Sequence, residues 1–449
     1  MSARVTVSTQ VVASAPPGLS TDFGQGFVLG ATQKGPTGRA VRVDGLAAYQ
    51  ATFGDRSGGT DTWDTLDAAF KEGLASAWVA RLAGPAALAA SRAVSTLTVT
   101  ATSAGAWGNS VTAEWVQSTS SLVVDGVSYP AGSVAVLQAA LAYGQAPVTV
   151  SGSALPSANV ASGPLSGGTD DANNAVIADR LELFSADLGD GAVVVAGKTS
   201  AQAAAALAAH CQATDRQGLL SAVSGSTLAQ AVTELSGLTD PSLNLLWPDP
   251  TVGAQKFPAA GAALGWRARA MATGNPAATP IHASHGTARF MTGVTTEVTD
   301  SAWKTANAAG LSVIRMLRGQ VRLAGWRSVA APGGNPNLQG ANYRDLIDRV
   351  RVGCAQVAES YVGENPDGRG LSLAAYGGLL TGFMAGLRDA GAFSPGENDP
   401  GFTVDVGPGV NPPEQIAAGQ IKARVAFRAV GTAEWFQIVV VVADAAGNL

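Results

Sequence analysis

The N-terminus of the chain carries an alternating strand pattern that has no partner nearby in the sequence. Val5, Val7, Thr9 and Val11 alternate with polar neighbours, which is the period of a β-strand. Residues 15–18 read APPG, and proline ends the strand because it has no N–H group to donate. A strand needs another strand to satisfy its backbone, so this one must pair with a distant part of the chain or with another chain.

The C-terminus carries the sharpest strand pattern of the chain. In the stretch IKARVAFRAV, the apolar Ile421, Val425 and Phe427 alternate with basic residues. This pattern predicts a strand with one apolar face and one basic face. A turn, GTAE, then leads into WFQIVVVV, which contains Trp435 and Ile438. We therefore expect a closing hairpin.

Between the two ends the composition changes several times, which predicts a mixed fold of helices and strands in more than one domain. Two short strands are expected between residues 27 and 43. Residues 94–165 are rich in Thr, Val and Ser with Gly and Asn turns, typical of a β-rich module. Within residues 181–240, the apolar run GAVVVAG precedes an Ala-rich helical stretch, as in a strand–helix layer.

The spacing of apolar residues also predicts three longer helices, over 64–82, 343–361 and 371–388. The segment SAWKTANAAG is expected to form a short helix, and the next one a hairpin that turns at Arg318–Gly319. NLLWPDP reads as a proline-punctuated loop, and a Gly/Pro/Asn-rich linker follows over residues 394–413.

Charge and cysteine content exclude several classes of protein. Charged residues make up only 14% of the 449-residue chain, and the net charge of -5 does not favour a nucleic-acid surface. Such a low charge content fits either a surface buried against other subunits or an Ala- and Gly-rich genome. Cys211 and Cys354 do not suggest a disulfide framework. No leader-like or membrane-spanning apolar run is visible, so we expect a soluble protein made in the cytoplasm.

The sequence offers little for catalysis or metal binding. His282 and His285 lie three apart in IHASHG, but no third ligand stands near them in the sequence. His210 and Cys211 are adjacent on a predicted helix and therefore point in different directions. Asp170 and its neighbour Asp171 lack the spacing of a Ca²⁺ loop and are expected to form turns. No metal, cofactor or catalytic residue is predicted.

The stretch GFVLGATQKGPTG, residues 26–38, looks at first like a phosphate-binding loop. In a Walker A loop the lysine follows the second glycine, whereas here Lys34 precedes Gly35 and a proline follows. No helix begins directly after this loop to hold an anion. We therefore expect a strand, a tight turn and a second strand, with Lys34 as an exposed loop charge.

Four blocks of the sequence resemble the contractile tail sheath protein family of phages, tailocins and related injection systems. They are GFVLGATQKGPTGRAVRVDGLAAYQATFGD, AWGN, WKTANAAGLSVIRMLRGQVRLAGWRSV and GQIKARVAFRAVGTAEWFQIVVVV, in the family's order. The residues that carry the resemblance in the core are Gly30, Lys34, Gly35, Pro36, Phe53, Gly54, Trp107, Gly108, Asn109, Asn307, Arg315, Gly325, Trp326 and Arg327. The Pro-Ala-Gly loop that usually precedes the third block is not obvious, and residues 85–240 are only loosely similar.

The resemblance implies an α+β, mixed α/β multidomain fold, in which a conserved α/β core carries N- and C-terminal strand arms and an inserted outer region. The expected parts are an N-terminal arm over 1–20, a first part of the core over 21–85, an inserted outer region over 86–240 (β-rich over 94–165, α/β over 181–240), a second part of the core over 241–393, and a C-terminal linker and strand-exchange hairpin over 394–449.

The resemblance also implies a mechanical function. It indicates a non-enzymatic subunit of a helical sleeve of hexameric rings, which surrounds a tail tube and contracts to drive the tube through a cell envelope, as in DNA ejection by a phage. Expected partners are further copies of the chain, the tube protein, and baseplate and tail terminator proteins, without nucleic acid or membrane insertion. The two strand arms would add to sheets of neighbouring copies. Charged residues near Arg388 are expected to face the tube.

Two other functions remain as alternatives. A secreted β-rich adhesin would explain the Thr/Ser-rich segment, but it predicts a signal or an anchor. An α/β hydrolase-like enzyme with its site in residues 181–290 predicts a nucleophile–base–acid set, and no such set has family spacing. The expected location is a virion tail or a contractile injection particle that is assembled in the cytoplasm of a bacterial host.

Overall fold

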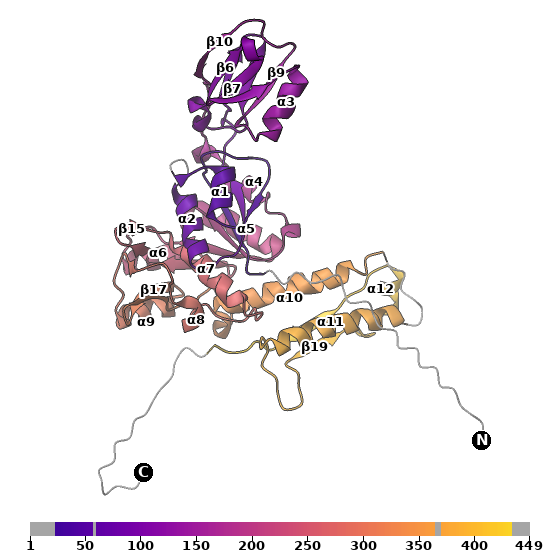
Figure 1. Ribbon diagram of the computed structural model, residues 1–449. Helices are drawn as coiled ribbons and strands as arrows, with labels where there is room; N and C mark the ends of the chain where they lie inside the picture. The colour runs from indigo at the N-terminus through magenta and orange to yellow at the C-terminus, as the bar shows by residue number, and fades with distance from the viewer. Residues whose placement is uncertain (1–22, 57–59, 364–369, 433–449) are drawn as a thin grey trace, which may run out of the picture. The chain divides into compact units, whose positions relative to one another are not determined.

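The computed structural model describes residues 23–56, 60–363 and 370–432 (Figure 1). These residues divide into a larger unit that extends to Gln356 and a smaller unit that starts at Val357. The larger unit contains a sheet covered by helices and an inserted β-rich module. The smaller unit contains two helices and one short sheet.

The centre of the larger unit is an eight-stranded sheet in the order β18-β17-β13-β12-β11-β1-β3-β2. Its strands are β1 Gly26–Gly30, β2 Val41–Val43, β3 Ala77–Arg81, β11 Ala192–Val195, β12 Gln217–Ser221, β13 Leu243–Trp247, β17 Ser312–Leu317 and β18 Gln320–Leu323. Six strands are parallel, and the edge strands β2 and β18 pair antiparallel with their neighbours. The chain order reverses between β1 and β11, which makes this a doubly wound sheet.

Alternating side chains of the buried strands build two cores, one on each face of the sheet. Val28 of β1 packs with α1, α2 and α7, whereas Phe27 and Leu29 pack with α5, α6 and α9. Both faces are covered, which is why a strand such as GFVLG is apolar throughout. The helices are α1 Leu46–Phe53, α2 Thr60–Lys71, α4 Ile177–Leu181, α5 Ser200–Thr214, α6 Leu228–Ser236, α7 Ala259–Met271, α8 Ala283–Gly286, α9 Asp300–Ala309 and α10 Ala341–Glu359. A small sheet of β14 Pro250–Val252, β15 Gln255–Lys256 and β16 Gly293–Val294 lies beside them.

The β-rich module is inserted between β3 and β11 and has its own core around Trp115 and Leu137. Its two sheets have the orders β4-β5-β9 and β10-β6-β7-β8. The elements are β4 Ser91–Val94, β5 Leu97–Ala101, β6 Thr112–Val116, β7 Ser121–Val124, β8 Val127–Pro130, α3 Val134–Tyr143, β9 Val148–Gly152 and β10 Val160–Pro164. The β-rich character expected for residues 94–165 is confirmed.

The smaller unit contains α11 Leu371–Asp389, α12 Pro413–Ala417, and the two strands β19 Phe402–Asp405 and β20 Arg424–Phe427. The expected helices over 343–361 and 371–388 are therefore present as α10 and α11. The linker expected over 394–413 is not free of regular structure, because β19 lies within it and pairs with β20.

Three further expectations need correction. The helix expected over 64–82 ends at Lys71, and Trp78 lies in β3. Gly73, with a φ of +117°, ends the helical path, and a spacing of four residues also places side chains on one face of a strand. Residues 181–240 were expected in the outer region, yet they supply β11 and β12 to the central sheet. NLLWPDP is not a loop, because its apolar residues form β13.

Two local expectations are confirmed. The strands β1 and β2 lie on either side of the glycine-rich loop that follows Gly30, although both pair with β3 and not with each other. The hairpin of β17 and β18 turns at Arg318–Gly319, whose φ angles of +50° and +77° suit a two-residue turn between twisted strands.

Candidate functional site

The C-terminal strand residues that the sequence singled out lie on β20 and just before it. Val425 pairs with Val404, and Phe427 pairs with Phe402 of β19. In β20 the odd-numbered residues are half-buried and the even-numbered ones are exposed, as the alternation predicts. Ile421 is 39% exposed ahead of the strand. The other arm residues, Val5, Val7, Thr9, Val11, Trp435 and Ile438, lie outside the described residues.

Within the described part of the chain, the sheet of β19 and β20 has two strands only. The ring of Phe393 covers one side of it, with ring centroids 5.3 Å from Phe427 and 5.9 Å from Phe402. A two-stranded sheet is marginally stable by itself, because each strand of such a sheet has one edge without a partner strand. Such an edge is suited to receive a further strand.

The exposed side of α11 is unusually poor in side chains. Gly378, Gly382 and Gly386 follow one another at helical spacing, and a Cβ atom at any of them would meet no atom within 4 Å. Glycine inside a helix costs about 1 kcal/mol relative to alanine. No contact within the described chain explains these three glycines. Arg388, at the end of this helix, pairs with its neighbour Asp389 at 2.8 Å.

The first block of signature residues holds the loop after β1 against the end of α1. Gly35 has a φ of +107°, and a Cβ atom there would lie 2.6 Å from the ring of Phe53. The backbone N–H of Lys34 donates to the carbonyl of Phe53 at 3.0 Å. Gly54, with a φ of +88°, ends α1 against the Gln33 side chain. Lys34 is half-buried, which corrects the expectation of an exposed loop charge.

The same loop contacts the inserted module through a buried arginine. Arg81 at the end of β3 donates from Nη1 to the carbonyl oxygens of Gly35 at 3.2 Å and Ala104 at 2.6 Å. Its Nη2 lies 3.3 Å from Asp170 Oδ1. Burial lowers the pKa of Arg81, and the carboxylate of Asp170 opposes that shift. The loop after β1, which includes Pro36, thus belongs to the junction between the sheet and the module.

The second and third signature blocks are also structural. The Asn109 side chain donates to the carbonyl of Gly168 at 2.9 Å and accepts from its N–H at 2.8 Å, which closes the module next to Trp107 and Gly108. In the third block, Arg327 Nε donates to Asn307 Oδ1 at 3.0 Å.

Three other members of the third block fix the same region. Gly325 leaves room for the Asn307 amide, because a Cβ atom there would lie 2.7 Å from its oxygen. Trp326 is buried in the core, and Arg315 pairs with Asp300 at 2.7 Å. The structure thus brings together residues within each of the first three blocks, and these contacts hold the fold together.

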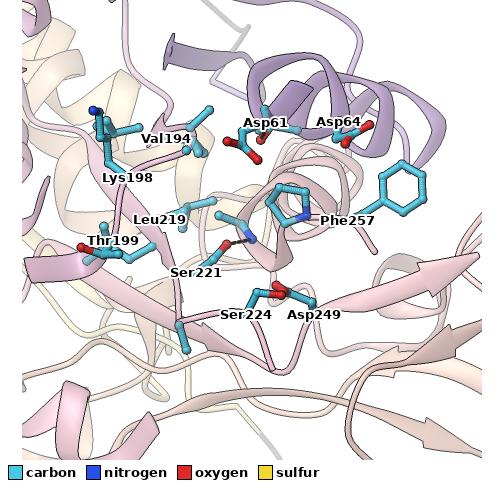
Figure 2. A pocket seen from close by; sticks show the side chains of 18 of the residues that line it. Asp61, Asp64, Val194, Lys198, Thr199, Leu219, Ser221, Ser224, Asp249 and Phe257 are labelled. Atoms are coloured by element: carbon cyan, nitrogen blue, oxygen red, sulfur yellow. Dashed lines mark hydrogen bonds between the residues drawn. The ribbon is translucent and has the colours of Figure 1, made fainter. Parts of the chain in front are cut away.

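A cavity of about 310 Å³ opens at the carboxyl ends of β11 and β12, where doubly wound proteins usually bind ligands (Figure 2). Its wall carries the carboxylates of Asp61, Asp64 and Asp249 and the amines of Lys198 and Lys256. Asp249 accepts from the N–H of Ala259 at 3.1 Å, at the beginning of α7, and burial raises its pKa. The carboxylates oppose an anionic ligand because they outnumber the amines.

The histidines and cysteines form no catalytic or metal constellation in the described ranges. The rings of His282 and His285 are 5.3 Å apart, and no group of three or more His, Cys, Asp or Glu side chains suited to a metal occurs there. Burial lowers the pKa of His210 to about 4, and the nearby Arg216 adds to this shift. Burial raises the pKa of the Cys211 thiol far above its ordinary value. Within the described residues, no helix is long and apolar enough to cross a membrane.

Sequence reasoning missed a buried carboxylate that joins distant segments of the larger unit. Glu72, at the end of α2, is fully buried and accepts hydrogen bonds from the backbone N–H groups of residues 289–291 and from Trp266 Nε1. Arg269 lies 3.5 Å from it. No local pattern could have revealed this contact, because its partners are about 200 residues away in the sequence.

The comparisons with known proteins concern the fold. No family model matches the sequence, and no curated protein matches it. Two crystal structures of sheath tail proteins are similar: one from Desulfitobacterium hafniense (15% identity, TM-score 0.60, covering 90% of this chain and 93% of that one) and one from Listeria innocua (13%, 0.61, 91% and 95%). The sheath complex of the extracellular contractile injection system PVC, in its contracted state, is also similar (14%, 0.60, 99% and 99%). The chain therefore has the fold of the contractile sheath tail proteins.

Proposed function

We propose that this protein is a structural, non-enzymatic subunit of a contractile sheath. The observation that carries the proposal is a structural similarity to the contracted sheath of an injection system. This similarity covers 99% of the present chain. The helical sheath of the anti-feeding prophage, also contracted, is similar over 99% of this chain with a TM-score of 0.57. In this function, hexameric rings stack into a helical sleeve around a tail tube, and contraction drives the tube through a cell envelope.

The two-stranded sheet of β19 and β20 supports assembly by strand exchange. Its outer edges offer backbone groups to a further strand, and the N-terminal pattern of residues 5–11 is that of a strand without a partner nearby in sequence. We infer that the N-terminal segment of one copy, together with the segment containing Trp435 and Ile438, adds to such sheets of neighbouring copies. Rigid subunits could then slide and rotate while their links persist.

Contraction in this proposal needs no nucleotide. The extended sleeve would be metastable, and new contacts between subunits in the shorter and wider form would supply the free energy. Partners are further copies of the chain, a tube protein, and baseplate and terminator proteins. The particle would be a phage tail or an injection particle that is assembled in a bacterial cytoplasm. The glycine-lined side of α11 and the neighbouring Arg388 would lie against the tube, where close approach of another backbone is possible.

Electron microscopy of the purified protein in negative stain tests the assignment. Sleeves or rings support it, whereas a uniform monomer at high concentration contradicts it. Deletion of residues 1–14 should abolish polymers and leave a folded subunit, and a truncated protein that still forms sleeves would refute strand exchange. For the tube contact, Arg388→Glu should impair co-assembly with the tube protein. The matched control is Arg351→Glu on the exposed side of α10.

A further inference from the structure

A group of buried residues, four of them charged, joins four segments of the larger unit that are far apart in the sequence. We call it the anchor junction and define it by Phe23, Asp190, Arg267, Asp345 and Arg349. Each of these residues is at most 6% exposed. Arg267 comes from α7, Asp345 and Arg349 from α10, and Asp190 from the turn before β11.

Arg267 is the centre of the anchor junction. Its Nε donates to Asp345 Oδ1 at 2.9 Å, which holds α10 against α7. Its Nη1 donates to the backbone carbonyl of Phe23 at 3.1 Å. One guanidinium therefore binds both the helix that leads into the smaller unit and the first described residue after the N-terminal segment.

Arg349 repeats this double contact one turn further along α10. Its guanidinium lies over the ring of Phe23, 5.0 Å from the ring centroid, and its Nη1 is 3.6 Å from Asp190 Oδ2. Two residues after Phe23, the Gln25 side chain donates to the carbonyl of Leu188 at 2.7 Å and to that of Asp190 at 3.2 Å. The residues that directly follow the N-terminal segment are thus held by α7 and α10 and by the turn before β11.

Stability alone does not explain so many buried charges. Burial raises the pKa of Asp345, so keeping this carboxylate ionised costs free energy that Arg267 only partly offsets. Apolar residues of similar volume often replace a buried ion pair without loss of stability. Directional, charged contacts instead resist the sliding of one segment along another. They favour one relative position of the two segments, and a small displacement already breaks them.

We propose that the anchor junction transmits tension between the N-terminal segment and α10, which leads to the smaller unit. This inference rests on the proposed function, in which both ends of the subunit are linked to neighbouring copies. A pull on the residues before Phe23 would then pass through Arg267 and Arg349 into α10. The parallel sheet would be bypassed, and the subunit would move as a rigid body during contraction.

Single-molecule pulling on the full-length monomer tests the anchor junction without any sleeve. Handles are attached at the N-terminus and at Val362→Cys, an exposed position just beyond α10, in a Cys354→Ser background. The double variant Arg267→Met/Asp345→Leu removes the charged contacts and keeps the volume. Its rupture rate at a given load should rise at least about ten-fold, the effect of losing one hydrogen bond to a charged group. Its thermal midpoint should stay near that of the parent.

The matched control is Arg344→Met/Asp348→Leu, which removes another buried ion pair of α10. In the described residues, the hydrogen bond and the cation–π contact of Phe23 are made by Arg267 and Arg349 instead. The rupture rate of this control should equal that of the parent. An unchanged rate in the Arg267/Asp345 variant, or an equal rise in the control, would overturn the proposal. Should the double variant fail to fold, Phe23→Leu removes the contact with Arg349 and should still speed rupture. Absence of sleeves in microscopy would instead count against the proposed function, since this measurement uses monomers.

Discussion

Replacing Glu72 by glutamine tests how the end of α2 holds the segment after α8. In the native protein, Oε2 accepts from Trp266 Nε1 at 2.8 Å and from the N–H of Arg289 at 2.9 Å. Oε1 accepts from the N–H groups of Phe290 at 2.9 Å and Met291 at 3.1 Å. Glutamine keeps one oxygen but replaces the other with an NH₂ group, which is a donor facing donors.

The magnitude follows from these contacts. Hydrogen bonds to a charged group contribute about 1.5–3 kcal/mol each, and Glu72→Gln abolishes two of them and weakens the others. Removing the charge also leaves Arg269 without the carboxylate that lies 3.5 Å away. Removing one partner of a buried charge network typically costs about 3–5 kcal/mol, so we expect a loss of this size in the free energy of unfolding of the larger unit.

Denaturant unfolding, followed by tryptophan fluorescence, measures the loss, and hydrogen exchange of the amides of residues 289–291 localises it. Exchange at these amides should accelerate more than in β12, because their acceptor is the altered group. Glu182→Gln, at an exposed position of the same unit, is the control and should change stability by less than about 0.5 kcal/mol. A loss below about 1 kcal/mol for Glu72→Gln would show that the carboxylate does not hold this segment.

Three further predictions concern other parts of the chain. Gly35→Ala should destabilise the larger unit by about 1–3 kcal/mol, because φ is +107° and the new Cβ would strike Phe53; an unchanged thermal midpoint would contradict this. Gly382→Ala on α11 should stabilise the monomer by about 0.5–1 kcal/mol, since no atom lies within 4 Å of the new Cβ atom, and a loss of stability would contradict this prediction. The pKa of His210, lowered to about 4, makes the folded state prefer the neutral ring, so this residue should cost stability as the pH falls from about 6.5 to 4. The thermal midpoint of His210→Gln should therefore fall less over that pH range than that of the parent. An equal fall in both proteins would refute the lowered pKa of His210.

Local patterns predicted much of the secondary structure. The helices α10 and α11, the β-rich module and the hairpin at Arg318–Gly319 were all expected, since each depends on spacing or turn chemistry within a few residues. Errors arose where two structures share a pattern. Trp78 lies four residues after Leu74, a spacing that suits one face of either a helix or a strand, and burial in the sheet decided for the strand.

The candidate assembly elements were predicted in part. The alternation in IKARVAFRAV correctly indicated a strand, but not that its partner would be β19, which lies in a segment read as a linker. What the signature residues do, such as the contact of Gly35 with Phe53, depends on close approaches of backbone and ring that no spacing in the sequence encodes.

By itself, the sequence determined the local elements, the absence of a recognisable catalytic motif, and a resemblance that the structural similarity bears out at the level of fold. Only the tertiary structure decided the strand order, which places β11 and β12 at the centre of the sheet, and the partners of the buried charges. Local patterns arise from interactions within a few residues of the chain. The hydrogen bonds of Glu72 to residues 289–291 and of Arg267 to Phe23 form only after distant segments have packed. Because these groups are buried, leaving any of them unpaired would cost stability.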